Sequence, residues 1–313
     1  MKEVWPDIPY TAWNETCSAL HLYCQVIGKY RLARTPWVNH SWHATFYVDA
    51  RGLTTSLIPD GPACGMEVQL DLLGHEVVVI SSDGRIGRLP LLAGSVASFN
   101  RRFKTLLADM GANPECSCVP NEIPDGVPFT KDDVLRPYDA EAVARFFHAL
   151  VQIDRVFKQF RTGFLGKASP VHLFWGSFDL AVTRFSGRKA PLHPGGIPAL
   201  PDKITCEAYS HQVSSAGFWP GGGGVDFPAF YSYAYPAPDG FSQAGVRPDA
   251  ACFDANLGEF ILPYDAVRTS PDPDGMLMEF LESSYRAAAD LGGWDRHTLE
   301  CATGRPLHPR PVP

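Results

Sequence analysis

The segment 169–188, SPVHLFWGSFDLAVTRFSGR, constrains the fold most, because it places three ionisable side chains inside an aromatic and aliphatic run. These side chains are His172, Asp179 and Arg184. An ionisable group among Phe, Trp and Leu loses its hydration, and a hydrogen bond, an ion pair or a metal must replace it. We therefore expect this segment to be the buried centre of the chain, with polar groups that are either structural or functional.

The same segment fits two local structures. Its apolar residues alternate as in a strand, whereas helical spacing aligns His172, Gly176 and Asp179. We favour a strand because Pro170 precedes the run, Gly176 interrupts it, and aromatic and β-branched residues suit a pleated surface. A single strand over 171–185 would be about 50 Å long, beyond the common range. A bend or bulge near Gly176 is therefore expected, and it can turn His172 and Asp179 to one side.

Apolar residues recur at helical spacing in four further segments. The expected helices cover 14–33, 95–111, 138–164 and 276–291, with Asn14 and Asp139 as candidate N-caps. Strand-like pieces bounded by turn residues fall between the helices. In chain order they are HATFYVDA, GLTTSLI, MEVQLDL and EVVVIS, and then ITCEAYSH, DFPAFYSYAY, AACFD and EFILPY. The first four read as an antiparallel meander.

These elements predict an α+β fold of two similar helix–antiparallel strands–helix halves. The expected division is 1–111 for the first half, 112–137 for a surface linker without periodicity, 138–300 for the second half and 301–313 for a flexible tail. The two leading helices end on similar tripeptides, Ile27-Gly28-Lys29 and Leu165-Gly166-Lys167. Internal duplication is one explanation. The other is coincidence, because helix–strands–helix is a common order.

Charge and cysteine usage restrict the partners and the compartment. The net charge of −7, without runs of Lys or Arg, provides no electrostatic footprint for nucleic acid or an anionic membrane. The start of the sequence lacks the apolar stretch of a signal peptide, and no segment approaches about 20 apolar residues. Only Cys116 and Cys118 among the eight cysteines are closely spaced, which favours reduced thiols. We expect a soluble cytoplasmic protein, and its oligomeric state stays open.

Familiar catalytic motifs are missing from the sequence. It contains no GxxxxGK[ST] phosphate loop, no GxGxxG after a strand, no GxSxG elbow and no HExxH helix. The glycine run 221–224 lacks the following helix and lysine that an anion site needs, so we interpret it as a flexible loop.

The best chemical constellation combines imidazoles and carboxylates near the expected strand ends. Its members are His40 and His43 in NHSWH, His172 and Asp179 in the central segment, and Glu207 and His211 in EAYSH. Histidine and carboxylate groups suit zinc, iron or manganese. The candidate ligands of such a divalent transition metal are His40, His43, His172 and His211. His172 and His211 are predicted to reach one shared ligand or ion.

Without a metal, the same residues form an acid–base site, in which Asp179 or Glu207 orients an imidazole as general base. Arg184 then binds a substrate carboxylate, or it forms an internal salt bridge with Asp179 or Glu207. Aromatic residues line an apolar pocket or fill the core, and the candidates are Trp175, Phe178, Phe218, Trp219, Phe230, Tyr231, Tyr233 and Tyr235.

The leading hypothesis is an enzyme with a small-molecule site at the junction of the two halves. The residues proposed to build it are His172, Asp179, Arg184, Glu207 and His211, together with His40 and His43. The alternative is a non-catalytic small-molecule-binding protein whose buried polar residues are structural. In both cases the partner is a small molecule, the cofactor is unknown, and neither nucleic acid nor a membrane is expected.

Five motifs carry a resemblance to a known family. They are HLY with VIGKYRLA, NHSWH with YVDARGLTT, the central segment, EAYSHQ, and GFWPG. Together they resemble a bacterial family listed as domain-of-unknown-function family 5996, over nearly the whole chain. The resemblance implies no activity. The residues that match its motifs are Asn39, His40, His172, Trp175, Asp179, Arg184, Glu207, His211 and Trp219, whereas Gln212 departs from an acidic residue expected in relatives.

Overall fold

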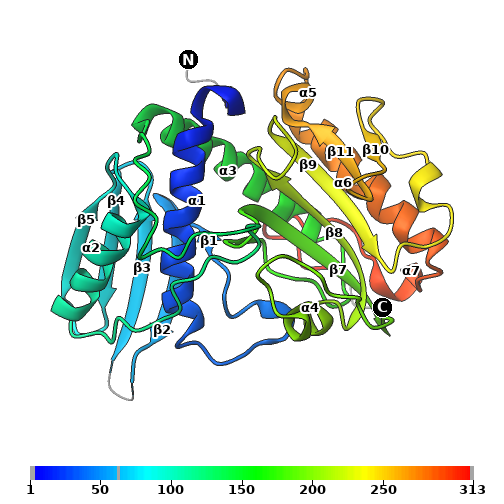
Figure 1. Ribbon diagram of the computed structural model, residues 1–313. Coiled ribbons are helices and arrows are strands. Elements are labelled where there is room, and N and C mark those ends of the chain that lie inside the picture. Colours follow the sequence, from blue (N-terminus) through cyan, green and yellow to red (C-terminus); the bar gives the residue numbers. More distant parts are fainter. Residues whose placement is uncertain (1–3, 62–63, 311–313) are drawn as a thin grey trace.

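The computed structural model describes residues 4–61 and 64–310, which form helices and two antiparallel sheets (Figure 1). This arrangement confirms the α+β class. Both halves begin and end with a long helix around a sheet, as the sequence predicts. Duplication and the exact domain limits stay predictions.

The first sheet is a five-stranded meander in chain order. Its strands are β1 (Tyr47–Val48), β2 (Gly52–Pro59), β3 (Gly65–Asp71), β4 (Glu76–Ser81) and β5 (Ile86–Pro90). The inward residues of β3, Met66, Val68 and Leu70, alternate along the strand and are fully buried. Figure 1 shows α1 (Tyr10–Leu32) and α2 (Val96–Asp109) against one face of this sheet. The meander is confirmed, and β5 is an additional strand.

The second sheet has six strands in the order β10-β11-β9-β8-β7-β6. They are β6 (His172–Phe174), β7 (Asp179–Lys189), β8 (His211–Trp219), β9 (Ala229–Tyr235), β10 (Cys252–Asp254) and β11 (Glu259–Pro263). The long helices α3 (Ala140–Arg161) and α6 (Pro273–Leu291) pack on one face (Figure 1). The short elements are α4 (Asp202–Ala208), α5 (Tyr264–Arg268), α7 (Arg296–Leu299), η1 (Asn39–Ser41) and η2 (Phe241–Gln243).

The two sheets meet at Phe46 and Leu173, just before β1 and within β6. The backbone N–H of Phe46 donates to the Leu173 carbonyl at 2.9 Å, and the N–H of Leu173 donates back at 2.8 Å. One hydrophobic core also contains side chains from both halves. The junction is therefore a packed and hydrogen-bonded part of the fold.

The central segment forms a hairpin where the sequence predicts one bent strand. β6 pairs with β7 so that His172 lies opposite Ala181 and Phe174 opposite Asp179. The chain reverses over 175–178, and Phe178 has a φ of 59°. Directly paired residues point to the same face of a sheet, so the hairpin puts His172 and Asp179 on one face. The strand assignment is confirmed, and the bend at Gly176 is a complete reversal.

Helix ends follow the local capping signals in two of the long helices. Ser95 accepts a hydrogen bond from the Ser98 N–H at 3.2 Å, and Asp139 accepts one from the Ala142 N–H at 3.0 Å. The first helix instead begins at Tyr10, four residues before the predicted cap Asn14. The predicted strand ITCEAYSH is wrong over most of its length, because α4 occupies 202–208. Its inward residues Ile204, Thr205 and Ala208 follow helical spacing.

Segment 112–137, described throughout, contains no helix or strand, in keeping with its lack of periodicity. It does more than cross the surface, however. Phe129 and Asp132 are buried, and Asn121 and Glu122 lie against the second half of the chain. The expectation of a purely exposed connection is therefore wrong, because this segment helps to build the site described next.

Candidate functional site

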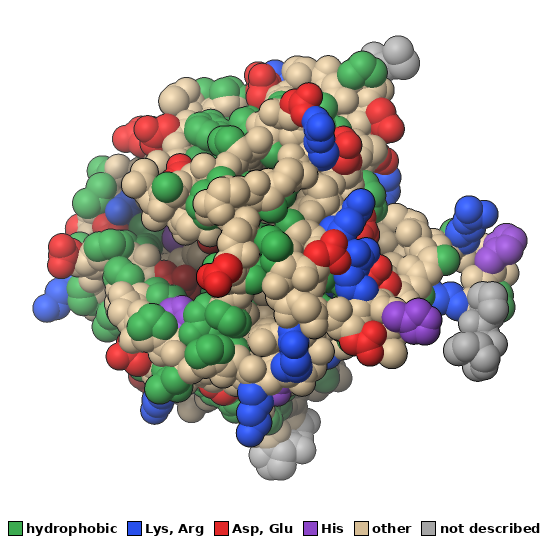
Figure 2. Space-filling view, turned by 90° about the vertical axis from the view of Figure 1, so that its right-hand side faces the viewer, with side chains coloured by type: hydrophobic (Ala, Val, Ile, Leu, Met, Phe, Trp, Pro, Cys, Tyr) green, Lys and Arg blue, Asp and Glu red, His purple; other side chains and the backbone are tan. Residues whose placement is uncertain are grey.

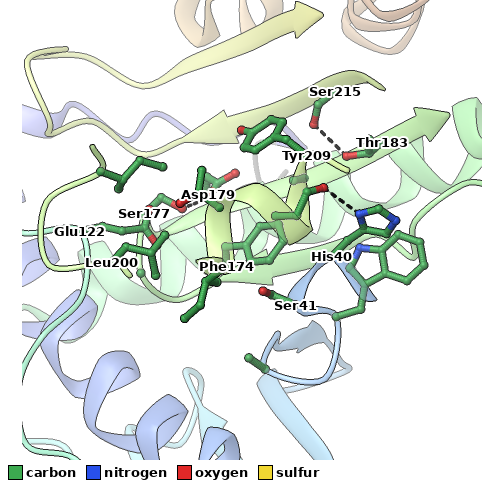
Figure 3. Close-up of a pocket in the computed structure, with 18 of the residues that line it drawn as sticks. His40, Ser41, Glu122, Phe174, Ser177, Asp179, Thr183, Leu200, Tyr209 and Ser215 are labelled. Carbon is green, nitrogen blue, oxygen red and sulfur yellow. Dashed lines mark hydrogen bonds between the residues drawn. The ribbon is translucent and has the colours of Figure 1, made fainter. Parts of the chain in front are cut away.

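A cavity of about 300 Å³ lies on the face of the six-stranded sheet opposite α3 and α6 (Figure 3). Its size falls at the lower end of the range for small-molecule pockets. The sheet forms the floor, while η1, α4 and the segments around Glu122 and Leu200 form the cover. Figure 2 shows a hollow in the surface with acidic side chains at its bottom and hydrophobic side chains around it.

The floor follows from strand alternation and cross-strand register. Every second residue of β7 from Asp179 to Phe185 faces the cavity. Thr183 lies opposite Ser215, and their hydroxyls are 2.8 Å apart. The neighbouring strands contribute Val213, Ser215 and Trp219 from β8, Tyr231 and Tyr233 from β9, and Glu259 from β11.

Gly217 of β8 allows an aromatic ring to lie across the strand. It pairs with both Ala181 of β7 and Tyr231 of β9. A Cβ at this position would collide with the Tyr231 ring. With glycine present, the Tyr231 hydroxyl reaches over β8 and donates a hydrogen bond to Oδ2 of Asp179.

Three carboxyl groups face the cavity, and Asp179 is the electrostatic centre of the set. Its side chain is buried, and Oδ1 and Oδ2 accept hydrogen bonds from the hydroxyls of Ser177 and Tyr231. Burial raises the pKa of Asp179, while these two hydrogen bonds favour the charged form and oppose that rise.

The other two carboxyl groups hold protons near neutral pH. Burial, reinforced by the charge of Asp179 and opposed by Lys29, raises the pKa of Glu122 to about 7. Burial, followed by the charges of Asp179 and Asp254, raises the pKa of Glu259 to about 8. The cavity therefore combines one carboxyl group that accepts hydrogen bonds from two hydroxyls with two carboxyl groups whose pKa values are about 7 and about 8.

Residues of α1 hold the Glu122 segment in place. Gln25 Nε2 donates to the Asn121 carbonyl at 2.9 Å, and the Asn121 N–H donates to Gln25 Oε1 at 2.7 Å. Lys29 Nζ donates to Asn121 Oδ1, and burial lowers the pKa of Lys29 to about 8. His21 Nε2 donates to the Gly176 carbonyl at 2.9 Å. These bonds tie the segment and the hairpin turn to one rigid helix.

The hairpin turn accommodates Glu122 because residue 176 is glycine. A Cβ on Gly176 would collide with Oε1 of Glu122. The backbone N–H of Glu122 donates to the Pro198 carbonyl at 3.0 Å, which also joins this residue to the cover. The close approach places Glu122 beside Ser177 and Asp179 (Figure 3).

Aromatic side chains form most of the cavity wall. Trp219 stacks on Tyr231 with ring centroids 4.3 Å apart, and the hydroxyls of Tyr209 and Tyr233 are 2.8 Å apart. Burial raises the pKa of Tyr209 to about 12, so this phenol is neutral at physiological pH. Of the aromatic candidates from the sequence, Trp175, Trp219, Tyr231 and Tyr233 line the cavity, whereas Phe178, Phe218, Phe230 and Tyr235 are not part of its lining.

His40 and Glu207 come together, but as a structural link. The backbone N–H of His40 donates to the two carboxylate oxygens of Glu207 at 2.9 and 3.2 Å. Nδ1 of His40 donates to the Ala208 carbonyl at 2.7 Å, and its Nε2 accepts from Lys167. Burial lowers the pKa of His40, which keeps the ring neutral. These contacts join η1 to α4 and so close one end of the cavity, which His40 also lines.

Arg184 lies on the opposite face of the sheet, because its neighbours Thr183 and Phe185 point into the cavity. Its side chain is 1% exposed. Nη2 donates to the Phe160 carbonyl at 2.5 Å and to Glu282 Oε1 at 3.1 Å. The salt-bridge interpretation is correct in kind, but its partner is Glu282 of α6. A role of Arg184 in binding a substrate carboxylate in this cavity is excluded by this placement.

His172 and His211 do not converge, so the prediction of a shared ion is wrong. His172 pairs with Ala181 of β7, and His211 pairs with Lys189 of the same strand. These two partners are eight residues apart, which corresponds to roughly 25 Å along the strand at 3.3 Å per residue. His172 is fully buried, and burial lowers its pKa to about 3. Neither of its ring nitrogens has a hydrogen-bond partner among the described residues. His211 Nδ1 lies 3.1 Å from the Ser210 hydroxyl.

The described residues provide no group of three or more His, Cys, Asp or Glu side chains placed to hold a metal ion. His40 and His211 have ring centroids 6.0 Å apart, but His43 turns toward the Val38 backbone and packs on Trp37. The four histidines proposed as metal ligands therefore do not gather at one site, although His40 and His211 are neighbours.

Sequence reasoning identified Asp179 and missed its two acidic partners. Glu122 lies in the irregular segment, where no periodicity marks an inward residue. Glu259 is the first residue of β11, and a carboxylate at the start of the apolar run EFILP was the available signal. Tyr209, at the end of α4, was hidden by the incorrect strand assignment.

Fold and site together define an α+β protein with an aromatic, acid-lined cavity on one face of an antiparallel sheet. The chain belongs to the family described as "Family of unknown function (DUF5996)", whose model matches residues 5–301. No curated protein and no solved structure matches the chain. Within 4–61 and 64–310, no helix has both the length and the apolar character needed to cross a membrane.

Proposed function

We propose that this protein is an enzyme that carries out acid–base chemistry on a small organic molecule bound in the cavity. The observation that supports this most is that the buried carboxyl groups of Glu122 and Asp179 face one cavity and interact electrostatically. Glu122 titrates at a pKa of about 7, whereas Asp179 is stabilised by two hydroxyl donors. Two interacting carboxyl groups, one of them with a pKa near neutral pH, are a common arrangement for acid–base catalysis.

In this proposal Glu122 transfers one proton to or from the bound molecule. Its pKa near working pH means that both the protonated and the charged form are available. In its charged form Asp179 raises the proton affinity of Glu122, and it orients the ligand. Tyr231 and Ser177 hold Asp179 in position. The aromatic wall reduces the access of water, which strengthens each electrostatic contact.

A non-catalytic small-molecule-binding protein is the second candidate. It is favoured by the structural engagement of His40, Glu207 and Arg184, which leaves fewer free groups for chemistry. For either candidate we propose a cytoplasmic location, supported by the eight free cysteines, and no nucleic-acid or membrane partner, supported by the net charge of −7.

The test compares wild-type protein with Glu122→Gln and with a matched control, Glu279→Gln, on the exposed side of α6. Each protein is incubated with a defined mixture of polar metabolites, and mass spectrometry follows the loss of each compound. We expect conversion of at least one compound by wild type and control, and a rate about 100-fold lower for Glu122→Gln, as is typical for loss of a general acid or base. Conversion that persists in Glu122→Gln contradicts the proposed role. Binding without conversion by any of the three proteins favours the second candidate.

A further inference from the structure

We propose that the cavity binds a small organic cation, a protonated amine attached to an aromatic or other apolar body. This inference rests on the small-molecule site proposed above and specifies the chemical class of its ligand. The ammonium group would lie among Asp179, Glu122 and Glu259, with the apolar body between the aromatic walls.

The charge of the lining favours a cation. Asp179, Glu122 and Glu259 all line the cavity, and no Lys or Arg belongs to its lining among the described residues. Two lysines that contact lining residues are already engaged. Lys29 donates to Asn121 and lies 5.5 Å from the Trp175 ring centroid. Lys167 contacts His40 at the other end, 4.9 Å from the Phe185 ring centroid. An anionic ligand would meet like charge at the acidic end.

Polar atoms without partners indicate that the ligand forms hydrogen bonds with the lining. Thr205 is 1% exposed and lines the cavity, yet its hydroxyl has no hydrogen-bond partner within the described part of the chain. The same holds for the Ser41 hydroxyl and for Oε2 of Glu259, both also in the lining. Buried polar groups of this kind are normally hydrogen-bonded. An ammonium group carries three N–H donors, and the Glu259 carboxylate oxygen and the two hydroxyl oxygens can all accept from such donors.

The walls suit the remainder of such a ligand. Indole and phenol rings attract cations over their faces, and Trp219 stacked on Tyr231 places two such rings beside Asp179. Phe174, Trp175 and Trp42 add apolar surface toward the His40 end. The volume of about 300 Å³ restricts the ligand to a compact molecule.

The test uses full-length protein and three sets of probes that share a skeleton and differ in charge. These are benzylamine, 2-phenylethylamine and tryptamine, each with its matching alcohol and carboxylate. Calorimetric titration at pH 7 should show that at least one amine binds about tenfold more tightly than its alcohol, with no measurable binding of its carboxylate, because one charge-assisted hydrogen bond accounts for such a ratio.

Two further readouts connect affinity to the carboxyl groups. Titrations in two buffers of different ionisation enthalpy should show release of protons at pH 6.5, because a bound cation favours the charged forms of Glu122 and Glu259. Glu259→Gln and Thr205→Val should each weaken amine binding about five- to tenfold, the usual effect of losing one hydrogen bond, while Glu279→Gln leaves it unchanged. A melting temperature close to that of wild type would show that both variants are folded.

The inference is overturned if an alcohol or a carboxylate binds as tightly as its amine, or if no amine binds with a Kd below about 10 mM. It is also overturned if Glu259→Gln and Glu279→Gln bind amines equally well. Amine binding without conversion would leave this inference standing and contradict the enzymatic proposal. Conversion of a neutral or anionic compound that depends on Glu122 would support the enzymatic proposal and contradict the inference of a cationic ligand.

Discussion

The two faces of the six-stranded sheet use polar residues in opposite ways. On the helix face, Arg184 uses its two terminal nitrogens on the Phe160 carbonyl and on Glu282. On the cavity face, Thr205 of the cover and Glu259 of the floor each keep an oxygen without a partner in the described structure. Burial alone therefore does not separate a structural polar group from a functional one. An oxygen without a partner becomes informative where it also faces a cavity, because Nε of Arg184 and both ring nitrogens of His172 lack partners within the described structure but do not line the cavity.

The difference follows from what covers each face. Two long helices, α3 and α6, close one face with side chains such as Phe160 and Tyr285, whose rings lie 3.5 and 4.4 Å from the Arg184 guanidinium. The short α4, the single turn η1 and irregular segments cover the other face. Short elements with few inward side chains fill less space than long helices, so a cavity remains.

The largest expected effect is on the helix face. Arg184→Met should lower the free energy of unfolding by about 3 kcal/mol, because it leaves Glu282 and the Phe160 carbonyl without their partner. The matched control Arg145→Met removes an ion pair with an exposed partner, Glu141, and should cost less than about 0.5 kcal/mol. Urea denaturation at pH 7 measures both. Equal stability of the two variants would contradict the structural role of Arg184.

An intermediate effect is expected on the cavity face at Gly217. Gly217→Ala should cost about 2 kcal/mol, because the added methyl group meets the Tyr231 ring and overpacks the sheet. It should also displace the Tyr231 hydroxyl from Asp179 and so weaken ligand binding. Gly94→Ala is the control, since nothing lies within 4 Å of its added Cβ. Thermal denaturation that shows equal melting temperatures for both variants would contradict this close contact.

The third effect concerns the pH dependence of stability, and it is small at any single pH step. In the folded protein the pKa of Glu122 is about 7, above its ordinary value of 4.5, so the folded state binds this proton more tightly than the unfolded state. The favourable contribution of this proton to the free energy of unfolding is therefore complete below pH 4.5. It is lost as pH rises toward 7, by at most about 1.4 kcal/mol per pH unit.

Glu122→Gln removes this titration. Relative to wild type, the variant should gain stability as pH rises from 4.5 to 7, by up to about 3 kcal/mol in total. Urea titrations at several pH values measure the difference, and Glu279→Gln should show none. A difference that stays constant with pH would mean that burial does not perturb Glu122.

Local sequence patterns were sufficient to predict the long helices, most strands and the α+β class. Ser95 and Asp139 cap helices by hydrogen bonds to residues three positions away, and β3 alternates over neighbouring residues. The unusual polarity of segment 169–188 also marked Asp179 as a candidate site residue, and this residue lines the cavity. All of these signals act over a few residues, so one sequence contains them completely.

Only the tertiary structure decided how the site is assembled. Strand register and packing between distant segments decide three features of the site. They determine whether the chain bends or reverses at Gly176, which face of the sheet Arg184 occupies, and which carboxyl groups lie with Asp179 in the cavity. Glu122 and Glu259 come from an irregular segment and from a strand start on opposite sides of the central hairpin in sequence. Their convergence depends on long-range contacts, which local periodicity does not encode, because a period defines a face of an element but not what that face meets.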